Sequence, residues 1–146
     1  LEAIEKMERD KVKMKFFGDT SVLSPRLREL IANTEEISKR FEGCQVNICL
    51  NYGGRDEIVY ACQKLVDEGK EINKENLSLA LYTGDCVEPD MIVRTAGEMR
   101  LSNFLLWQSS YSELYFTDTL WPDFSDDDLI VAINDFYRRR RKYGGL

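Results

Sequence analysis

Hydrophobic residues along this chain follow two patterns, and the two patterns alternate. Four short segments are rich in apolar, β-branched and aromatic residues, have the length of strands, and are bounded by turn residues. We predict strands over Val12–Phe17, Gln45–Leu50, Asp90–Arg94 and Glu113–Phe116. Between them, apolar residues return every three or four positions, which is the period of one face of a helix.

Helix boundaries are marked by capping residues. Ser24 can accept a hydrogen bond from a free backbone amide, and Pro25 suits the first helical position. Acidic residues after Ser125 and basic residues at the end of the same segment suit the helix dipole. We predict helices around Leu1–Met7, from Ser24 to Phe41, over Arg55–Glu68, near Lys74–Leu81, over Ser102–Gln108, and from Ser125 into Arg138–Lys142.

Alternating helices and strands predict an α/β fold, with a mostly parallel sheet flanked by helices. Ligands of such folds bind beyond the carboxyl ends of the strands. The loops Asn51–Gly54 and Thr95–Arg100 follow predicted strands and are therefore candidate binding loops. A length of 146 residues suits a single domain spanning residues 1–146. The chain starts without methionine, inside a helical pattern, so we expect it to be part of a longer protein.

Composition narrows the function classes. The chain has 20 Lys and Arg against 26 Asp and Glu, a net charge of −6, and five of its bases stand together at Arg138–Lys142. An acidic body with one basic end argues against a nucleic-acid binder but permits a local anion site. No apolar run is long enough to span a bilayer, and the charged N-terminal segment does not resemble a signal peptide.

Cysteine and histidine usage limits the possible chemistry. The four cysteines, at 44, 49, 62 and 86, show no C-x-x-C spacing, and the sequence has no histidine. A structural zinc site and a histidine-activated nucleophile are therefore not expected. Free thiols are typical of the cytoplasm. Chemistry is left to carboxylates, arginines, hydroxyls, backbone amides or a metal ion.

The segment from Val93 to Phe124 carries the candidate chemistry. Arg94 and Arg100 flank a turn of small residues, and Ser102 follows at a predicted helix start. Two guanidinium groups, a hydroxyl and free helix amides would suit a phosphate group. The alternative is that these arginines pair with surface carboxylates.

Glu98 and Glu113 are the candidate carboxylates in this segment. Mg²⁺ takes oxygen ligands, often one or two carboxylates together with substrate phosphates. Glu113 stands among aromatic residues, where an acid is unexpected. The alternative for Glu98 is an ion pair with Arg94 or Arg100.

Several motifs of this chain resemble the cis-prenyltransferase family, in particular its bacterial undecaprenyl diphosphate synthase type. The similarity runs through nearly the whole chain, except for residues 69–87. The motifs are Phe16–Asp19, Asn51–Arg55, Arg94–Glu98, Arg100–Gln108, Tyr111–Phe116, Leu120–Phe124 and Arg141–Gly145. The resemblance implies a truncated form of the undecaprenyl diphosphate synthase fold.

The resemblance also implies a function. Family members extend an allylic diphosphate, such as farnesyl diphosphate, with isopentenyl diphosphate units and form cis double bonds. By the family pattern, Arg94, Arg100 and Ser102, with Leu101 beside them, would bind isopentenyl diphosphate. Glu98 would act in catalysis by supporting the arginines, and Glu113 would bind Mg²⁺, in some cases at a partner subunit's site.

The family further implies a homodimer of the cytoplasm that contributes to isoprenoid and cell-wall biosynthesis. Peripheral contact with the membrane would come through the lipid product. The basic end of the chain resembles the family's R-x-G motif, which completes the neighbouring subunit's site. Lys142 stands where that motif has arginine, and lysine lacks the two-pronged guanidinium.

The family's phosphate loop of D-G-N-G-R-W type, the histidine and the Ser-x-Asn segment are absent from this sequence. We therefore expect the chain to supply the isopentenyl diphosphate half of the site and to be inactive alone. Two alternatives remain open. One is a non-catalytic partner subunit of a heteromeric cis-prenyltransferase, and the other is an unrelated α/β anion-binding module.

Overall fold

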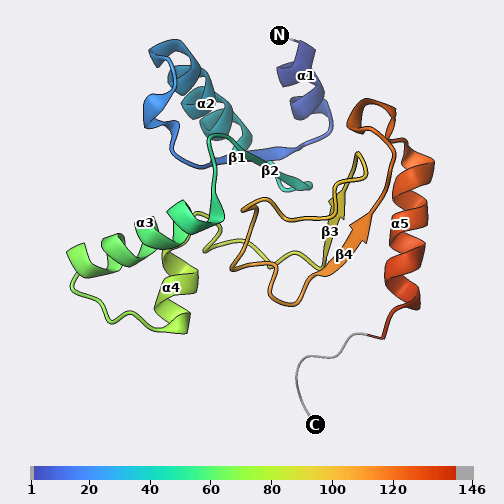
Figure 1. Cartoon of the computed structure of the whole chain (residues 1–146). Helices are drawn as coiled ribbons and strands as arrows, with labels where there is room; N and C mark the ends of the chain where they lie inside the picture. The colour runs from blue at the N-terminus through green and yellow to red at the C-terminus, as the bar shows by residue number, and fades with distance from the viewer. Residues whose placement is uncertain (1, 141–146) are drawn as a thin grey trace. The chain divides into compact units, whose positions relative to one another are not determined.

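The computed structural model describes residues 2–140 (Figure 1). The chain divides into two compact units, residues 1–85 and residues 86–146. The helices and strands of the first unit are α1 (Glu2–Arg9), β1 (Lys13–Phe17), α2 (Pro25–Ser38), β2 (Gln45–Cys49), α3 (Gly54–Asp67) and α4 (Lys74–Ala80). Those of the second unit are β3 (Met91–Arg94), β4 (Glu113–Phe116) and α5 (Asp126–Arg138). Short 3-10 turns occupy Thr20–Val22 and Trp121–Asp123.

Both sheets are parallel, as the sequence predicts. In the first unit β1 pairs with β2, and the register runs from Lys13 opposite Gln45 to Phe17 opposite Cys49. In the second unit β3 pairs with β4, from Met91 opposite Glu113 to Arg94 opposite Phe116. All four predicted strands are confirmed to within one residue at each end. Each sheet, as described, has two strands.

Side chains of α2 accept hydrogen bonds from backbone N–H groups of β1. The backbone N–H of Met14 donates to Ser38 Oγ at 3.0 Å, and the N–H of Phe16 donates to Glu35 Oε1 at 2.8 Å. Ser38 is fully buried. A strand edge with unpaired amides invites pairing with another chain. Glu35 and Ser38 of α2 thus accept the hydrogen bonds that a third strand would otherwise accept on this side.

The predicted helix starts in the first unit are confirmed. Ser24 Oγ accepts from the Leu27 N–H at 3.3 Å, with Pro25 at the first position of α2. Asn73 Oδ1 accepts from the Asn76 N–H at 2.9 Å and begins α4. α3 packs against α4. Apolar residues buried in this unit are Met7, Phe17, Ile31, Ala61, Leu65, Leu77, Ala80 and Leu81.

Gly18 closes β1 where the chain passes very near the end of β2. Its φ is +121°, and a Cβ at this position would lie 2.0 Å from the carbonyl oxygen of Leu50. The N–H of Leu50 donates to the Phe17 carbonyl at 2.8 Å, and the N–H of Asp19 donates to the Asn51 carbonyl at 3.2 Å. The two loops that follow β1 and β2 are therefore fastened together, and only glycine fits there.

One predicted helix is wrong. Residues 102–108 form a run of turns, with φ of +48° at Ser102, +66° at Asn103 and +45° at Leu105. These angles do not occur in a right-handed helix. Gln108, at the end of this segment, is only 4% exposed. Helical propensity and a capping serine are a weak preference that tertiary packing overrides.

No helix within residues 2–140 has both the length and the apolar character needed to cross a membrane.

Candidate functional site

Arg94 ends β3, and the turn that follows it is tied to the segment after β4. The N–H of Ala96 donates to the Thr119 carbonyl and the N–H of Gly97 to the Thr117 carbonyl, both at 2.9 Å. The N–H of Thr117 in turn donates to the Arg94 carbonyl at 3.0 Å. These bonds give the turn a defined position at the carboxyl end of the sheet. They also engage the amides of Ala96 and Gly97, which are therefore not available to an anion.

Two successive residues of this turn have a left-handed backbone, which glycine adopts without strain. Ala96 has a φ of +64° and Gly97 a φ of +68°. A Cβ on Gly97 would stand 3.0 Å from Asp118 Oδ1. A larger residue at this position would strain the backbone and push against the carboxylate.

A cavity of about 380 Å³ opens beside this turn. Its lining residues come from β3 and the loop that follows, and all belong to the second unit: Ile92, Val93, Arg94, Thr95, Ala96, Glu98, Arg100, Leu101 and Phe104. Both candidate arginines, Glu98 and Leu101 are among them. The wall thus combines two arginines with aliphatic and aromatic residues.

The two arginines of the cavity differ in their partners. Arg100 forms an ion pair with Glu98, and the Arg100 side chain is 64% exposed. This was the alternative that the sequence left open for Glu98. Within residues 2–140, no side-chain hydrogen bond or ion pair engages Arg94, which is half-buried. Arg94 is therefore the guanidinium that a new anion meets with the fewest competing contacts.

Ser102 is exposed and is not among the residues that line the cavity. Because residues 102–108 are not helical, the helix amides expected to add to the anion site do not exist here. The arrangement of charge at the cavity therefore rests on Arg94, Arg100 and Glu98.

Glu113 lies at the other end of the sheet from Arg94. It begins β4 and stands opposite Met91, whereas Arg94 stands opposite Phe116. Three residues of strand separate these positions, which corresponds to about 10 Å. Within this chain Glu113 is thus set apart from the cavity.

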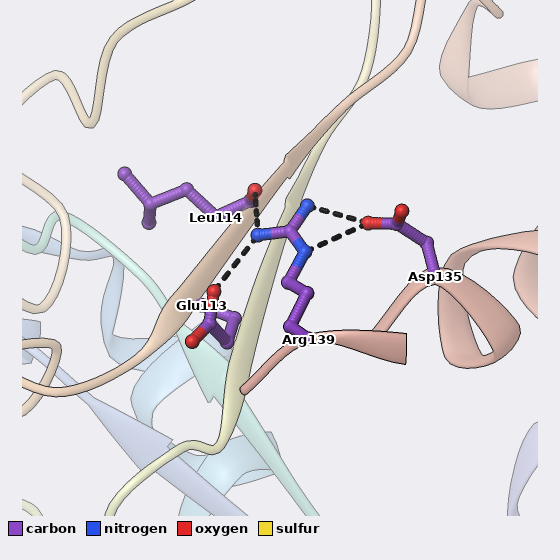
Figure 2. A network of polar contacts seen from close by, with 4 residues as sticks. All are labelled: Glu113, Leu114, Asp135 and Arg139. Carbon is purple, nitrogen blue, oxygen red and sulfur yellow. Dashed lines mark hydrogen bonds and ion pairs between the residues drawn. The ribbon is translucent and has the colours of Figure 1, made fainter. Parts of the chain in front are cut away.

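The Glu113 carboxylate is held by Arg139 (Figure 2). Arg139 Nη1 donates to Glu113 Oε2 at 2.9 Å and to the Leu114 carbonyl at 3.0 Å. Its Nε and Nη2 both donate to Asp135 Oδ2, one turn earlier on the same segment. These bonds, first to Glu113 and then to Asp135, raise the pKa of Arg139 above its ordinary value.

Sequence reasoning placed Arg139 among the basic residues at the end of the last helix and missed this contact. The contact between Arg139 and Asp135 could have been predicted, because residues four apart on a helix lie on the same face. The contact between Arg139 and Glu113 joins residues 26 apart in the sequence and follows only from the fold.

The donor set fits a hard cation only in part. Among the described residues, no group of three or more acidic or cysteine side chains gathers into a potential metal site. Glu98 and Glu113 each offer carboxylate oxygens, the ligand type that Mg²⁺ prefers, but they do not converge. Mg²⁺ held by this chain would therefore take one carboxylate and complete its shell with phosphate oxygens, water or another subunit.

Comparison with known proteins identifies the family. The pattern of the putative undecaprenyl diphosphate synthase family, a family of prenyltransferases, matches residues 1–144. The chain belongs to this family. Membership removes the alternative of an unrelated anion-binding module.

The relatives include both curated sequences and solved structures. The isoprenyl transferase of Wolinella succinogenes is 46% identical over 138 residues, which are 94% of this chain and 60% of that protein. A probable undecaprenyl diphosphate synthase from Campylobacter jejuni superposes with a TM-score of 0.92 at 38% identity, covering 99% of this chain and 68% of that one. This likeness confirms the predicted fold class.

A third relative is named for a different product. Lavandulyl diphosphate synthase from Lavandula x intermedia, solved with dimethylallyl diphosphate, superposes with a TM-score of 0.90 at 33% identity. The superposition covers 97% of this chain and 65% of the lavandulyl diphosphate synthase chain. The chain thus spans about 60% of the Wolinella relative and two thirds of these solved proteins.

The predicted R-x-G segment, which includes Lys142, lies outside the described residues.

Proposed function

We propose that this chain takes part in cis-prenyl chain elongation, in which an allylic diphosphate such as farnesyl diphosphate is transferred onto isopentenyl diphosphate. In this proposal the cavity beside β3 binds isopentenyl diphosphate. Arg94 and Arg100 hold the diphosphate, Leu101 contacts the substrate, and Ser102 approaches it only if the 102–108 segment moves.

The observation that carries the proposal is the mixed wall of the cavity. Arg94 and Arg100 line the same cavity as Ile92, Leu101 and Phe104. Arginine binds phosphate oxygens through two parallel hydrogen bonds, and apolar surface suits a short hydrocarbon group. A ligand with a diphosphate head and a five-carbon tail matches both parts of this wall.

Glu98 is proposed to act in catalysis through the arginines. Its ion pair with Arg100 keeps that guanidinium at the cavity, where it positions the second substrate close to the reacting carbon. Glu113 is proposed as a ligand of Mg²⁺. When bound, that ion would stabilise the negative charge that develops on the departing diphosphate.

The remaining parts of the proposal concern the whole enzyme. We propose a homodimer of the cytoplasm, with peripheral membrane contact through its lipid product, and a place in isoprenoid and cell-wall biosynthesis. Single-domain behaviour over residues 1–146 is proposed as well. The acidic composition of the chain supports the absence of a nucleic-acid partner.

Ligand binding tests the cavity. We expect the chain to bind isopentenyl diphosphate, and to bind inorganic pyrophosphate more weakly because pyrophosphate leaves the apolar wall uncovered. Arg94→Ala should weaken both by about tenfold or more, the effect of losing a hydrogen bond to a charged group. Titration calorimetry measures each affinity.

Arg138→Ala is the matched control, because Arg138 is an exposed arginine of the same unit that does not line the cavity. It should leave both affinities unchanged. Equal binding by the unchanged chain and by Arg94→Ala would show that the cavity is not the diphosphate site.

Elongation tests the second part of the proposal. The polypeptide of residues 1–146, given farnesyl diphosphate, isopentenyl diphosphate and Mg²⁺, should form no longer product, because its sequence has no phosphate loop to hold the allylic diphosphate. Radiolabelled isopentenyl diphosphate and chromatography of the lipid products provide the measurement. Product above the background of a protein-free reaction would contradict the expectation, and an active bacterial undecaprenyl diphosphate synthase serves as the positive control.

A further inference from the structure

The Glu113–Arg139–Asp135 network has a geometry beyond that of a simple surface ion pair. Figure 2 shows the Arg139 guanidinium between the start of β4 on one side and Asp135 on the other. All three of its nitrogens donate hydrogen bonds, to two carboxylates and one backbone carbonyl. Arg139 is 33% exposed and Glu113 is 26% exposed, so solvent reaches both only in part.

Asp135 sets the orientation of the Arg139 guanidinium. Because Nε and Nη2 are taken by Asp135 Oδ2, the remaining Nη1 is the nitrogen left for β4. Nη1 then contacts the Leu114 carbonyl and Glu113 Oε2 together. A planar guanidinium fixed in this way offers Glu113 Oε2 a donor in one defined position.

Only one oxygen of that carboxylate is used. Within residues 2–140, Glu113 Oε2 accepts from Arg139, and no hydrogen bond engages Glu113 Oε1. Carboxylates that bind metals commonly bind through one oxygen while a neighbouring residue holds the other. The net formal charge of Glu113, Arg139 and Asp135 is negative, so a divalent cation would still be attracted here.

We propose that Arg139 is a positioning residue for Glu113: it holds Oε2 and thereby presents Oε1 to a divalent cation. This inference rests on the proposed role of Glu113 as a metal ligand. Asp135 contributes by orienting Arg139. The competing possibility is that the network only braces the end of α5 against β4.

Binding of Mn²⁺ alone to the purified chain provides the test, with free Mn²⁺ followed by electron paramagnetic resonance. Mn²⁺ takes the same oxygen ligands as Mg²⁺. Arg139→Gln should weaken Mn²⁺ binding by about tenfold or more, the usual effect of losing a residue that orients a ligand. Arg139→Lys should lie between, because lysine keeps the charge and can donate hydrogen bonds, but its single ammonium nitrogen cannot reproduce the planar three-point geometry.

Arg138→Gln is the matched control, since it removes the same charge from an exposed neighbour that has no ion pair among the described residues. It should bind Mn²⁺ like the unchanged chain. Asp135→Asn should weaken binding less than Arg139→Gln. Thermal unfolding of each variant, recorded alongside, detects a bracing role, which would lower the melting temperature and leave Mn²⁺ affinity unchanged.

Glu113→Gln separates the two levels of the proposal. Loss of Mn²⁺ binding in Glu113→Gln, with normal or tighter binding in Arg139→Gln and Arg139→Lys, overturns the positioning role alone. Unchanged binding in Glu113→Gln, or no binding by the unchanged chain, overturns the metal role of Glu113 and with it this inference. Should Arg139→Gln fail to fold, Asp135→Asn and Arg139→Lys decide the question.

Discussion

The Glu57 side chain places a carboxyl group where almost no water reaches, because only 1% of the residue is exposed. It accepts a hydrogen bond from the Tyr52 hydroxyl at 2.5 Å and another from the Tyr82 N–H at 3.0 Å. Tyr52 lies in the loop after β2, and Tyr82 follows α4. One buried acid thus joins a candidate binding loop to the end of a helix.

Replacing this acid should destabilise the first unit. Glu57→Ala removes a buried side chain and the acceptor of both of these hydrogen bonds, so we expect a loss of about 3 kcal/mol in the free energy of unfolding. Denaturation by urea measures it. Glu36→Ala, at a side chain of α2 that is 78% exposed, is the control and should change stability by less than about 0.5 kcal/mol. A similar small effect for both variants would contradict the structural role of Glu57.

Arginines of this chain also show how far residue type determines role. Arg94, Arg100 and Arg139 are alike in sequence terms, but the first has no side-chain partner among the described residues, the second pairs with Glu98, and the third joins Glu113 to Asp135. A guanidinium that is already engaged must give up a contact to bind a new anion. Arg94 is therefore the strongest candidate to meet a diphosphate first.

At the scale of elements, α5 is the clearest case of local sequence deciding structure. Ser125 Oγ accepts from the Asp128 N–H at 3.3 Å, and Asp128 Oδ2 accepts from the Ser125 N–H at 2.8 Å. This reciprocal pair is a capping box, and it satisfies two amides that the first turn leaves unpaired. The hydrogen bonds from Ser125 hold the pKa of the Asp128 carboxyl below its ordinary value.

Stability of α5 should therefore depend on Ser125 and on pH. Ser125→Ala should cost about 1 kcal/mol near pH 7. A lowered folded-state pKa stabilises the fold above the ordinary aspartate value and loses that contribution as the pH falls through the folded-state value. Because the variant has already lost part of this contribution, the difference in free energy of unfolding between the variant and the unchanged chain should be smaller at about pH 3 than at pH 7.

Urea unfolding at both pH values checks this expectation. Asn134→Ala, at an exposed position in the middle of α5, is the control and should not destabilise the helix. An equal cost of Ser125→Ala at both pH values would show that the Asp128 carboxylate does not contribute to the cap.

At the scale of the whole molecule, the open question is cooperativity. The chain divides into units of residues 1–85 and 86–146, whereas its length predicts one domain. Both tryptophans, Trp107 and Trp121, belong to the second unit, while four of the five α-helices found among residues 2–140 belong to the first. Tryptophan fluorescence therefore reports on the second unit, and far-ultraviolet circular dichroism reports mainly on the helices of the first.

If residues 1–146 act as one domain, tryptophan fluorescence and far-ultraviolet circular dichroism should give the same urea midpoint. A single transition links the two probes because neither unit could then unfold without the other. Trp107→Phe and Trp121→Phe identify which tryptophan carries the signal. Two separate midpoints would show that the units unfold independently and would contradict the single-domain prediction.

The sequence by itself determined the strands, the helix caps and the candidate loop after β3. These features depend on neighbours in the chain: an apolar run between turn residues, or a serine before a proline. The closeness of Arg94, Glu98, Arg100 and Leu101 around one cavity also follows from the sequence, because residues within one short loop at a strand end cannot lie far apart.

Only the tertiary structure decided the rest. It made residues 102–108 a run of turns, although their capping residues favour a helix, and it left Ser102 off the cavity wall. It also placed Glu113 at the opposite end of its sheet from Arg94 and gave it Arg139 as a partner. The physical reason is the same in each case: contacts between residues far apart in the sequence are set by packing in the folded chain, which overrides local preferences.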